Sequence, residues 1–401
     1  MYFSRINFYL LNNIFSNTKE AFSLKSDFEL LRAQFLFKII ENKTLVKVST
    51  FLTNFALKFY LPVTPIIKMT VFNHFCGGVS ELDCNPVIKK MYDKKVSSVL
   101  DFSTEAFNSE IEFDNCYDKK ISIIEFIKYR SEIPFAVFKP TCLGSLDLFK
   151  KKTKGEDLNF EENLLWIKVV ERFEGVCQKA YDNDIKILID AEEVFVQKAI
   201  DDLALLMMLK FNREKPIIFN TVQMYRLDRL EYLSNLLKDK SNKDIVFGFK
   251  LVRGAYMEKE RLIAKTLNIK SPICITKKDT DINFNSGLDF VFNNLERISL
   301  VCGSHNEDSV IKVMDFMKKR KIKFNDNRIW FGQLYGMSDN ITFNLASMGY
   351  NCFKILPFGP VRNLMPYLIR RAEENTSVKG QTGRELQLII NEKKRRASER
   401  F

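Results

Sequence analysis

The sequence predicts an α/β fold, a distorted, TIM-like (β/α)8 barrel that follows an N-terminal helical region. Three observations lead to this prediction. Short apolar runs of strand length occur eight times after Gly78, amphipathic helical patterns separate most of them, and 401 residues suffice for eight such units. Strands that alternate with helices pair in parallel, and eight units suit a closed barrel. The same alternation also allows an open, doubly wound sheet.

The N-terminal region, residues 15–75, is predicted to be helical. Apolar residues recur there at intervals of three and four, as Phe28, Leu31 and Phe35 do, and two prolines end the pattern after Leu61. We expect this region to pack against the barrel. Docking to a membrane surface is the alternative.

The first 14 residues contain Arg5, no acid and several bulky apolar residues. This composition is compatible with a short mitochondrial presequence, and it is equally compatible with an ordinary N-terminus.

Overall composition leaves the class of partner open. The formal net charge of +12 permits nucleic acid, an anionic membrane or a phosphorylated cofactor, and a basic solvated surface explains it as well. The eight cysteines are scattered without a CxxC pair or a nearby histidine. We therefore expect buried thiols in a reducing compartment and no metal centre.

The predicted barrel domain comprises residues 76–401. Between its second and third units, the charged segment Phe149–Glu162 reads as a solvated surface insertion, and the chain ends in a helical pattern from Gly383 to Phe401. The eight strands are expected, in chain order, at Val96–Phe102, Phe135–Lys139, Ile185–Asp190, Ile217–Asn220, Phe247–Val252, Leu300–Gly303, Ile329–Gln333 and Cys352–Leu356.

One predicted strand, Phe247–Val252, carries Lys250 inside an apolar run and is followed by Arg253 and Gly254. Desolvating an unpaired ammonium is costly, so Lys250 requires a partner. If the strand ends at a ligand site, Lys250 and Arg253 can meet an anion or an electron-rich ring there. A salt bridge at the strand end explains both residues without a ligand.

Polar or small residues follow nearly every predicted strand. In a parallel barrel all the carboxyl ends share one rim, where ligands bind, so these side chains are expected to converge. They are Lys139, Asp190 with Glu192, Asn220 with Gln223, Lys250 with Arg253, Ser304 with His305 and Asn306, and Gln333.

Two rim positions allow specific alternatives. Asp190 and Lys139 would lie on neighbouring strands and could pair across the barrel mouth, either at a ligand site or as a plain buried ion pair. His305 opens a predicted helix, whose free N–H groups favour phosphate oxygens. An N-cap formed by Ser304 or Asn306 explains that motif equally well.

Arg370 and Arg371 lie on a predicted helix after the last strand. Guanidinium groups suit a carboxylate through paired hydrogen bonds. Pairing of Arg370 with Glu374, one turn later, is the alternative. The sequence has no GxGxxG after a strand, no Walker A motif and no GxSxG elbow. Residue chemistry alone thus predicts a barrel with a polycationic mouth and no particular reaction.

Longer stretches of the chain resemble proline dehydrogenase, from about Phe15 to the C-terminus and in the same order as in the family. Eukaryotic, mitochondrial members are the most similar. The stretches are FGFKLVRGAYMEKER, IKMTVFNHFCGG, VSSVLDF, ILIDAEE with FVQKAI, FNREKPIIFNTVQMY, SHNED, WFGQLYGMSDNITF and PFGPVRNLMPYLIRRAEENTSVKG.

The resemblance implies a barrel that binds FAD without a Rossmann motif and oxidises L-proline to 1-pyrroline-5-carboxylate by hydride transfer to flavin N5. It further implies electron transfer to a membrane quinone, peripheral membrane association on the matrix side of the mitochondrial inner membrane, and no nucleic-acid partner.

Site residues carry over by position. Arg370 and Arg371 resemble the pair that clamps the substrate carboxylate, and Lys139, Asp190 and Lys250 resemble residues at the reacting centre. Tyr256 and Leu251 would wall the proline ring. The flavin-contacting positions are Ala191, Gln223, Lys250, Arg253, Gly254, Ala255, Tyr256, Thr276, Ser304, His305, Asn306 and Gln333.

One position departs from the family pattern. Two residues before Pro357, where proline-specific members place a tyrosine, this chain has Ile355. Hydroxyproline dehydrogenase, a relative that differs at this position, is therefore the main alternative. A flavin-less barrel retained as a binding protein is the alternative from another functional class.

Overall fold

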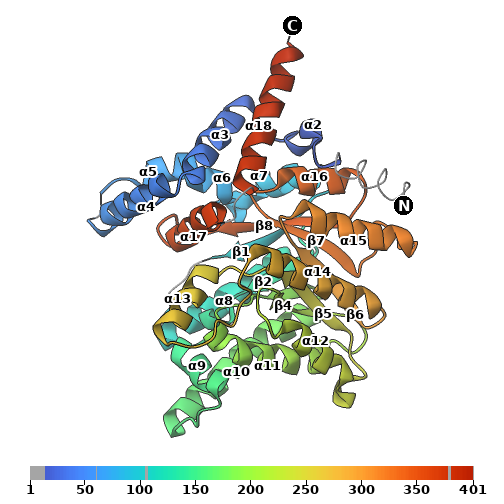
Figure 1. Ribbon diagram of the computed structural model, residues 1–401. Coiled ribbons are helices and arrows are strands. Elements are labelled where there is room, and N and C mark those ends of the chain that lie inside the picture. Colours follow the sequence, from blue (N-terminus) through green and yellow to red (C-terminus); the bar gives the residue numbers. More distant parts are fainter. Residues whose placement is uncertain (1–13, 60, 104–106, 378–380, 401) are drawn as a thin grey trace.

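Eight parallel strands close into one barrel in the computed structural model, which describes residues 14–59, 61–103, 107–377 and 381–400 (Figure 1). The strands pair in chain order, and β8 returns to β1, so the closed barrel is confirmed and the open sheet is excluded. The strands are β1 (Ser97–Phe102), β2 (Phe135–Phe138), β3 (Lys186–Ile189), β4 (Ile218–Gln223), β5 (Phe247–Val252), β6 (Ile298–Gly303), β7 (Ile329–Leu334) and β8 (Cys352–Phe358).

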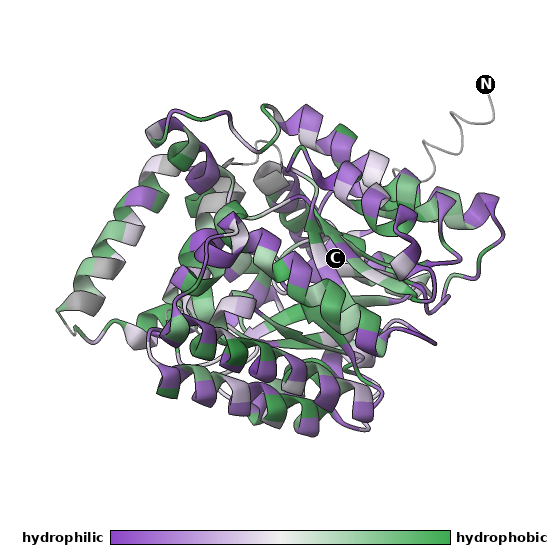
Figure 2. Ribbon diagram, turned by 90° about the horizontal axis from the view of Figure 1, so that it is seen from below, coloured by the Kyte–Doolittle hydropathy of each residue, from purple (hydrophilic) through white to green (hydrophobic). Residues whose placement is uncertain are grey.

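These runs form strands because both of their faces are buried, which allows continuous apolar sequence. Figure 2 shows the barrel strands largely in the colours of hydrophobic residues, whereas the surrounding helices alternate along their length. Inside the barrel, Phe135 packs against Phe219 and Phe353 with ring centroids 5.6 and 5.3 Å apart. This apolar plug fills the middle of the barrel interior, below the polar residues of the rim.

The outer layer consists of α7, which precedes β1, and of helices that follow the strands. They are α7 (Glu81–Tyr92), α8 (Glu110–Ile127), α9 (Leu146–Lys154), α10 (Phe160–Asp182), α11 (Val194–Phe211), α12 (Arg229–Lys238), α13 (Met257–Thr266), α14 (Lys277–Asn293), α15 (Glu307–Lys319), α16 (Asp339–Ser347), α17 (Met365–Ser377) and α18 (Gln381–Ser398).

We predicted that the charged segment Phe149–Glu162 is a surface insertion, and this prediction is wrong. Its first part completes α9 and its last part begins α10, and Phe149 is fully buried. Gly155, at φ +72°, ends α9, while Asn159 caps α10. A left-handed glycine and a capping asparagine thus produce a short helical connection whose lysines lie on the outer surface.

The N-terminal region is helical, as predicted, but it is broken into α2 (Thr18–Ala21), α3 (Asp27–Glu41), α4 (Lys43–Lys58), α5 (Thr64–Ile67), a π-helical turn (Lys68–Phe72) and α6 (Asn73–Phe75). Pro65 lies in the first turn of α5, where its missing N–H is not needed, so it starts a helix rather than ending one.

Helix α3 packs on α18, with Leu30, Ala33 and Phe37 against Leu388 and Ile389. The N-terminal region is thereby joined to the C-terminal helices. The proposed presequence lies almost entirely outside the described residues. Across the described ranges, no helix has both the length and the apolar content that a membrane span requires.

Candidate functional site

Lys250, on β5, and Asp190, directly after β3, form an ion pair at the barrel mouth. The Lys250 side chain is 5% exposed and that of Asp190 is 21% exposed. The expectation that Lys250 requires a partner is confirmed. The structure pairs Asp190 with Lys250, because both side chains point into the barrel interior. The possible pairing of Asp190 with Lys139, on the neighbouring strand, stays a prediction.

Leu251 does not reach the mouth, contrary to our prediction. Side chains alternate along a strand, so Lys250 faces inward and Leu251 faces outward. Leu251 is fully buried in the layer between sheet and helices, and its methyl group lies 3.4 Å from the position that a Cβ would take on Gly287 of α14. It cannot wall a substrate ring.

Arg253 joins three elements on the same rim. Its Nε donates to Asp281 Oδ1 at 2.8 Å, and its two terminal nitrogens donate to Ser304 Oγ at 2.8 Å and Ser309 Oγ at 2.9 Å. The salt bridge that we considered at this strand end therefore exists, here to Asp281 on α14. A fixed cation is thereby held between β5, β6 and α15.

The SHNED motif begins α15 as expected. Asn306 caps the helix by accepting from the Ser309 N–H at 2.9 Å, and Ser304 Oγ accepts from the Asn306 N–H at 3.1 Å. His305 Nδ1 lies 2.9 Å from Ser338 Oγ. The N-cap alternative is thus confirmed, and it leaves the helix N-terminus at the mouth.

Burial, together with the charges of Lys354, Arg371 and Arg253, lowers the pKa of His305 to about 3. His305 is therefore neutral at physiological pH. Cations from β8, α17 and the end of β5 thus act on this ring electrostatically. The predicted polycationic mouth is present.

Two glutamines hold the rim in place. Gln223 Nε2 donates to the Glu192 carbonyl oxygen at 2.7 Å, and Gln333 Nε2 donates to the Ser304 carbonyl oxygen at 3.1 Å. Thr342 Oγ1 donates to Gln333 Oε1 at 2.8 Å. Both amides are buried, so they fix the loops that carry the other site residues.

Glu192, which we expected on the rim but to which we assigned no particular role, is a buried carboxyl. It accepts from the Thr141 N–H at 2.9 Å and the Thr141 hydroxyl at 2.6 Å, which fixes the turn after Lys139. Burial raises the pKa of Glu192 to about 7, although these hydrogen bonds and the charge of Lys139 act in the opposite direction. In the sequence, the position of Glu192 close to Asp190, in a run of acidic residues after a strand, indicated that it belongs to the site.

Our list of site residues omitted Lys354. It lies on β8 with no exposed side-chain area, and its ammonium pairs with Asp339 Oδ1 at 2.9 Å. The burial of Asp339 raises its pKa, but the charges of Lys354 and Lys25 outweigh this and lower it overall. Lys354 lies inside the apolar run Cys352–Leu356, as Lys250 lies inside its own strand, so the sequence also indicated that Lys354 requires a partner.

Helix α17 brings its arginines toward this mouth. Arg371 is 7% exposed, and its guanidinium lies 5.1 Å from the Tyr367 ring centroid. Arg370, the preceding residue, is half-buried. The effect of Arg371 on His305 places that guanidinium near the start of α15.

The remaining predicted residues line the rim in different ways. Ile355 on β8 is half-buried, packs on the apolar plug and is in register with Leu334 of β7. Ala191, Gly254, Ala255 and Tyr256 are half-buried in the loops after β3 and β5, while Thr276 is exposed and caps α14. Gly254 has φ +128°, and a Cβ there would lie 2.5 Å from the Tyr225 ring.

The mouth fits a nucleotide cofactor such as FAD. Helices α14 and α15 direct their N-termini, capped by Thr276 and Asn306, to the loops of the rim, and such ends favour phosphate oxygens. Arg253 adds fixed positive charge. Thr221 Oγ1, in register with Lys250, is buried and has no hydrogen-bond partner within the described part of the chain.

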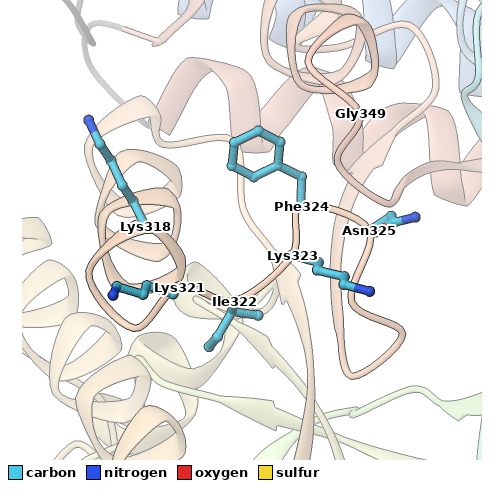
Figure 3. Close-up of a pocket in the computed structure, with 7 residues that line it drawn as sticks. All are labelled: Lys318, Lys321, Ile322, Lys323, Phe324, Asn325 and Gly349. Atoms are coloured by element: carbon cyan, nitrogen blue, oxygen red, sulfur yellow. The ribbon is translucent and has the colours of Figure 1, made fainter.

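A second hollow lies at the opposite end of the barrel (Figure 3). Its lining residues belong to the segments that precede β7 and β8, which are the amino ends of those strands. They are Lys318, Lys321, Ile322, Lys323, Phe324, Asn325 and Gly349. This hollow is therefore separate from the rim where the predicted site residues gather.

Comparisons with known proteins agree with this geometry. The proline dehydrogenase family model matches residues 84–384. The carbapenem antibiotics biosynthesis protein CarD of Pectobacterium carotovorum subsp. carotovorum is 34% identical over 301 residues, which cover 75% of this chain and 78% of that protein. Mitochondrial proline dehydrogenase 2 of Arabidopsis thaliana is 30% identical over 377 residues, which cover 83% of this chain and 79% of that protein.

Among solved structures, proline utilization A of Bdellovibrio bacteriovorus, inactivated by N-propargylglycine, matches with a TM-score of 0.68 and 20% identity over 92% of this chain and 37% of that chain. The chain spans about a third of the length of the solved structures that it matches. This likeness shows the same fold. With the family model matching most of the chain, the conclusion is that this protein belongs to the proline dehydrogenase family.

Proposed function

We propose that this protein is an FAD-dependent enzyme that oxidises L-proline to 1-pyrroline-5-carboxylate and passes the electrons to a membrane quinone. The observation that carries the proposal is the convergence of Lys250 with Asp190, Arg253 and Arg371 on one barrel mouth in a member of this family. The family's mitochondrial relatives support a location on the matrix side of the inner membrane, with peripheral membrane association.

The substrate is an amino acid, so its carboxylate requires a cationic partner. Arg370 and Arg371 would supply two guanidinium groups for it, and such bidentate pairing fixes orientation as well as position. Lys139 and Asp190 would lie beside the substrate. Tyr256 and Ile355 would border its ring; Leu251 is removed from this set because it faces α14.

The cofactor would be held by residues of the loops after β3 to β7. Arg253 and the helix ends at Thr276 and Asn306 would meet its phosphates, and the remaining contacts would come from Ala191, Gln223, Lys250, Gly254, Ala255, Tyr256, Ser304, His305 and Gln333. FAD, when bound, accepts the hydride from C5 of proline at its N5 position.

The chain's own contribution is positioning and fixed charge. Arg371 would hold the carboxylate so that C5 of proline faces the cofactor, which avoids the entropy cost of orienting the two reactants. Lys250 is a preorganised cation in a water-poor mouth, where it favours development of negative charge. His305 is neutral and can serve as a hydrogen-bonding group without adding charge.

Anaerobic titration of the purified, FAD-reconstituted protein tests the proposal. L-Proline is expected to bleach the visible flavin absorbance, and the pyrroline product is expected to accumulate when an artificial electron acceptor is added. A colourless protein that takes up no FAD would instead support a barrel retained for binding. Bound flavin that proline does not reduce would also contradict the proposal.

Hydroxyproline dehydrogenase is the second candidate, and Ile355 favours it. This side chain borders the apolar plug at the mouth, where a tyrosine would add a hydroxyl and an aromatic face. A branched aliphatic residue leaves room for a substituent on the substrate ring. The relative kcat/KM for L-proline and trans-4-hydroxy-L-proline separates the two candidates.

A further inference from the structure

Helices α4 and α5 stand out from the barrel and expose an apolar face. Figures 1 and 2 both show them on the left, away from the strands. Along α4 and at the residue directly after it, side chains at spacings of 3, 4, 7 and 11 from the first are exposed: Val48 at 50%, Phe51 at 69%, Leu52 at 58%, Phe55 at 50% and Phe59 at 58%. This spacing places the five side chains on one stripe of the helix.

The stripe is not the face by which α4 is attached. Among the α4 side chains that the structure describes, Val46 and Ala56 are buried, and the helix packs on α3 and on α17. A helix attached to a domain by one side normally presents polar residues on the other side. Here the outward side is apolar as well, and Phe55 and Phe59 pair there with ring centroids 4.5 Å apart.

The apolar face continues beyond α4. Ile66 of α5 and Met69 of the π-helical turn are each 66% exposed. On α3, Phe28 and Phe35 are 69% and 60% exposed. We define the paddle as the five residues of the α4 stripe together with Ile66 and Met69. An exposed patch of this extent marks an interaction surface.

The charged residues near the paddle indicate the kind of partner that it binds. From position 42 to position 80 the sequence contains four lysines and no aspartate or glutamate, and Lys47 and Lys68 are exposed beside the paddle. Apolar residues flanked only by cations suit the boundary between headgroups and acyl chains of an anionic bilayer. A surface for a second protein copy would be expected to include acids that match its own lysines.

We propose that the paddle docks this protein on the surface of an anionic lipid membrane. Docking through the paddle would hold α17, which carries Arg370 and Arg371, next to the membrane, because α4 packs on α17. The proposal deepens the proposed function, since a membrane-borne electron acceptor would then lie beside the mouth. Docking itself requires neither substrate nor turnover.

Vesicle flotation of the purified holoprotein, without proline, tests the proposal. The probes are vesicles of phosphatidylcholine alone and of phosphatidylcholine mixed with phosphatidylglycerol. The wild type is expected to float mainly with the anionic vesicles. The triple variant Phe51→Ser, Leu52→Ser, Phe55→Ser is expected to lose about tenfold or more of its partition coefficient, since each exposed ring or leucine contributes to insertion.

Helix α10 offers a matched control. Its Phe160, Leu164 and Ile167 are 78%, 49% and 52% exposed, so the same three serine substitutions remove a similar apolar surface elsewhere. This control variant is expected to float like the wild type. Neutralising Lys47 and Lys68 as glutamines should weaken binding to anionic vesicles by roughly tenfold or more and leave binding to neutral vesicles unchanged.

Equal flotation of the wild type and the paddle variant would overturn the proposal. So would a wild type that does not float but is dimeric by light scattering, with a monomeric paddle variant, because a second copy would then cover the face. Both serine variants are expected to keep wild-type circular dichroism and dye-linked proline oxidation. Absence of that oxidation in the wild type as well as in the variants would contradict the proposed function and leave the flotation result intact.

Discussion

Lys250 and Asp190 are 60 positions apart in sequence and form an ion pair inside the barrel mouth. The lysine is the more deeply buried partner, with a 5% exposed side chain against 21% for the aspartate. A pair of this kind contributes little net stability while intact, but removal of one partner leaves an uncompensated charge.

Removal of Asp190 should therefore cost more stability than removal of Lys250. We expect Asp190→Ala to lower the free energy of unfolding by about 3 to 5 kcal/mol, Lys250→Met to lower it less, and the double variant to recover part of the loss. Urea unfolding of the four proteins measures the coupling. The exposed pair Lys198 and Asp202 of α11 is the control, with an expected loss below about 1 kcal/mol. If the double variant lost as much unfolding free energy as the two single variants together, the result would contradict an energetic coupling of Lys250 with Asp190.

Arg371→Met should raise KM for proline sharply. The substrate carboxylate would lose a charged partner, which costs roughly 2 to 5 kcal/mol in kcat/KM. Steady-state kinetics with an artificial acceptor measures it. Arg328→Met is the matched control, because Arg328 pairs with Asp326 in the loop before β7, at the other end of the barrel. Unchanged kinetics of the Arg371 variant would remove the carboxylate clamp.

Ile355→Tyr should shift substrate preference toward proline. A tyrosine at this half-buried position would occupy the space that a 4-hydroxyl substituent needs, so the ratio of kcat/KM for L-proline over trans-4-hydroxy-L-proline should rise about tenfold or more. Ile355→Leu preserves volume and should leave the ratio near that of the wild type. A ratio that is the same in all three proteins would show that Ile355 does not contact the substrate ring.

Arg253→Gln should reduce flavin content. The substitution removes the hydrogen bonds to Asp281, Ser304 and Ser309 together with the fixed charge, so the cofactor loses a phosphate partner and the start of α15 loses its support. The ratio of visible flavin absorbance to protein absorbance measures occupancy. Arg320→Gln, which affects the contact to the Phe292 carbonyl at the far end of α15, is the control. Full occupancy in the Arg253 variant would contradict its role.

Glu385 should make stability depend on pH. Burial, with the nearby charge of Asp339, raises the pKa of Glu385 from 4.5 to about 7. Since the folded state binds this proton more tightly than the unfolded chain does, its contribution is complete below pH 4.5 and is lost as the pH rises through about 7. The loss amounts to about 3 kcal/mol.

Glu385→Gln keeps an acceptor for the Ser338 N–H, which lies 2.9 Å from Glu385 Oε1, and removes the titration. The difference in unfolding free energy between variant and wild type should therefore grow between about pH 5 and about pH 8. Urea unfolding across this range measures it. Glu192, whose pKa is also raised to about 7, titrates in both proteins and cancels from the difference. Parallel stability profiles would contradict the raised pKa.

Local pattern predicted much of this molecule. Eight apolar runs predicted eight strands, and β5 has the bounds that the pattern predicted, because a strand buried on both faces must be continuously apolar. The polar residues at the carboxyl ends predicted the rim, because parallel strands all end on one side of a barrel. Period-two alternation would also have turned Leu251 outward once Lys250 was placed inside.

The sequence by itself determined the eight strands, the gathering of polar residues at their carboxyl ends and the need of Lys250 for a counter-charge, since these follow from burial and periodicity along the chain. The closure of the strands into a barrel rather than an open sheet was decided by the tertiary structure. Only the tertiary structure decided that Asp190 meets that need, that Asp339 does so for Lys354, and that Arg371 of α17 reaches the surroundings of His305. Burial energy demands a partner for each charge, but only the closure of the barrel decides which distant residue stands opposite it.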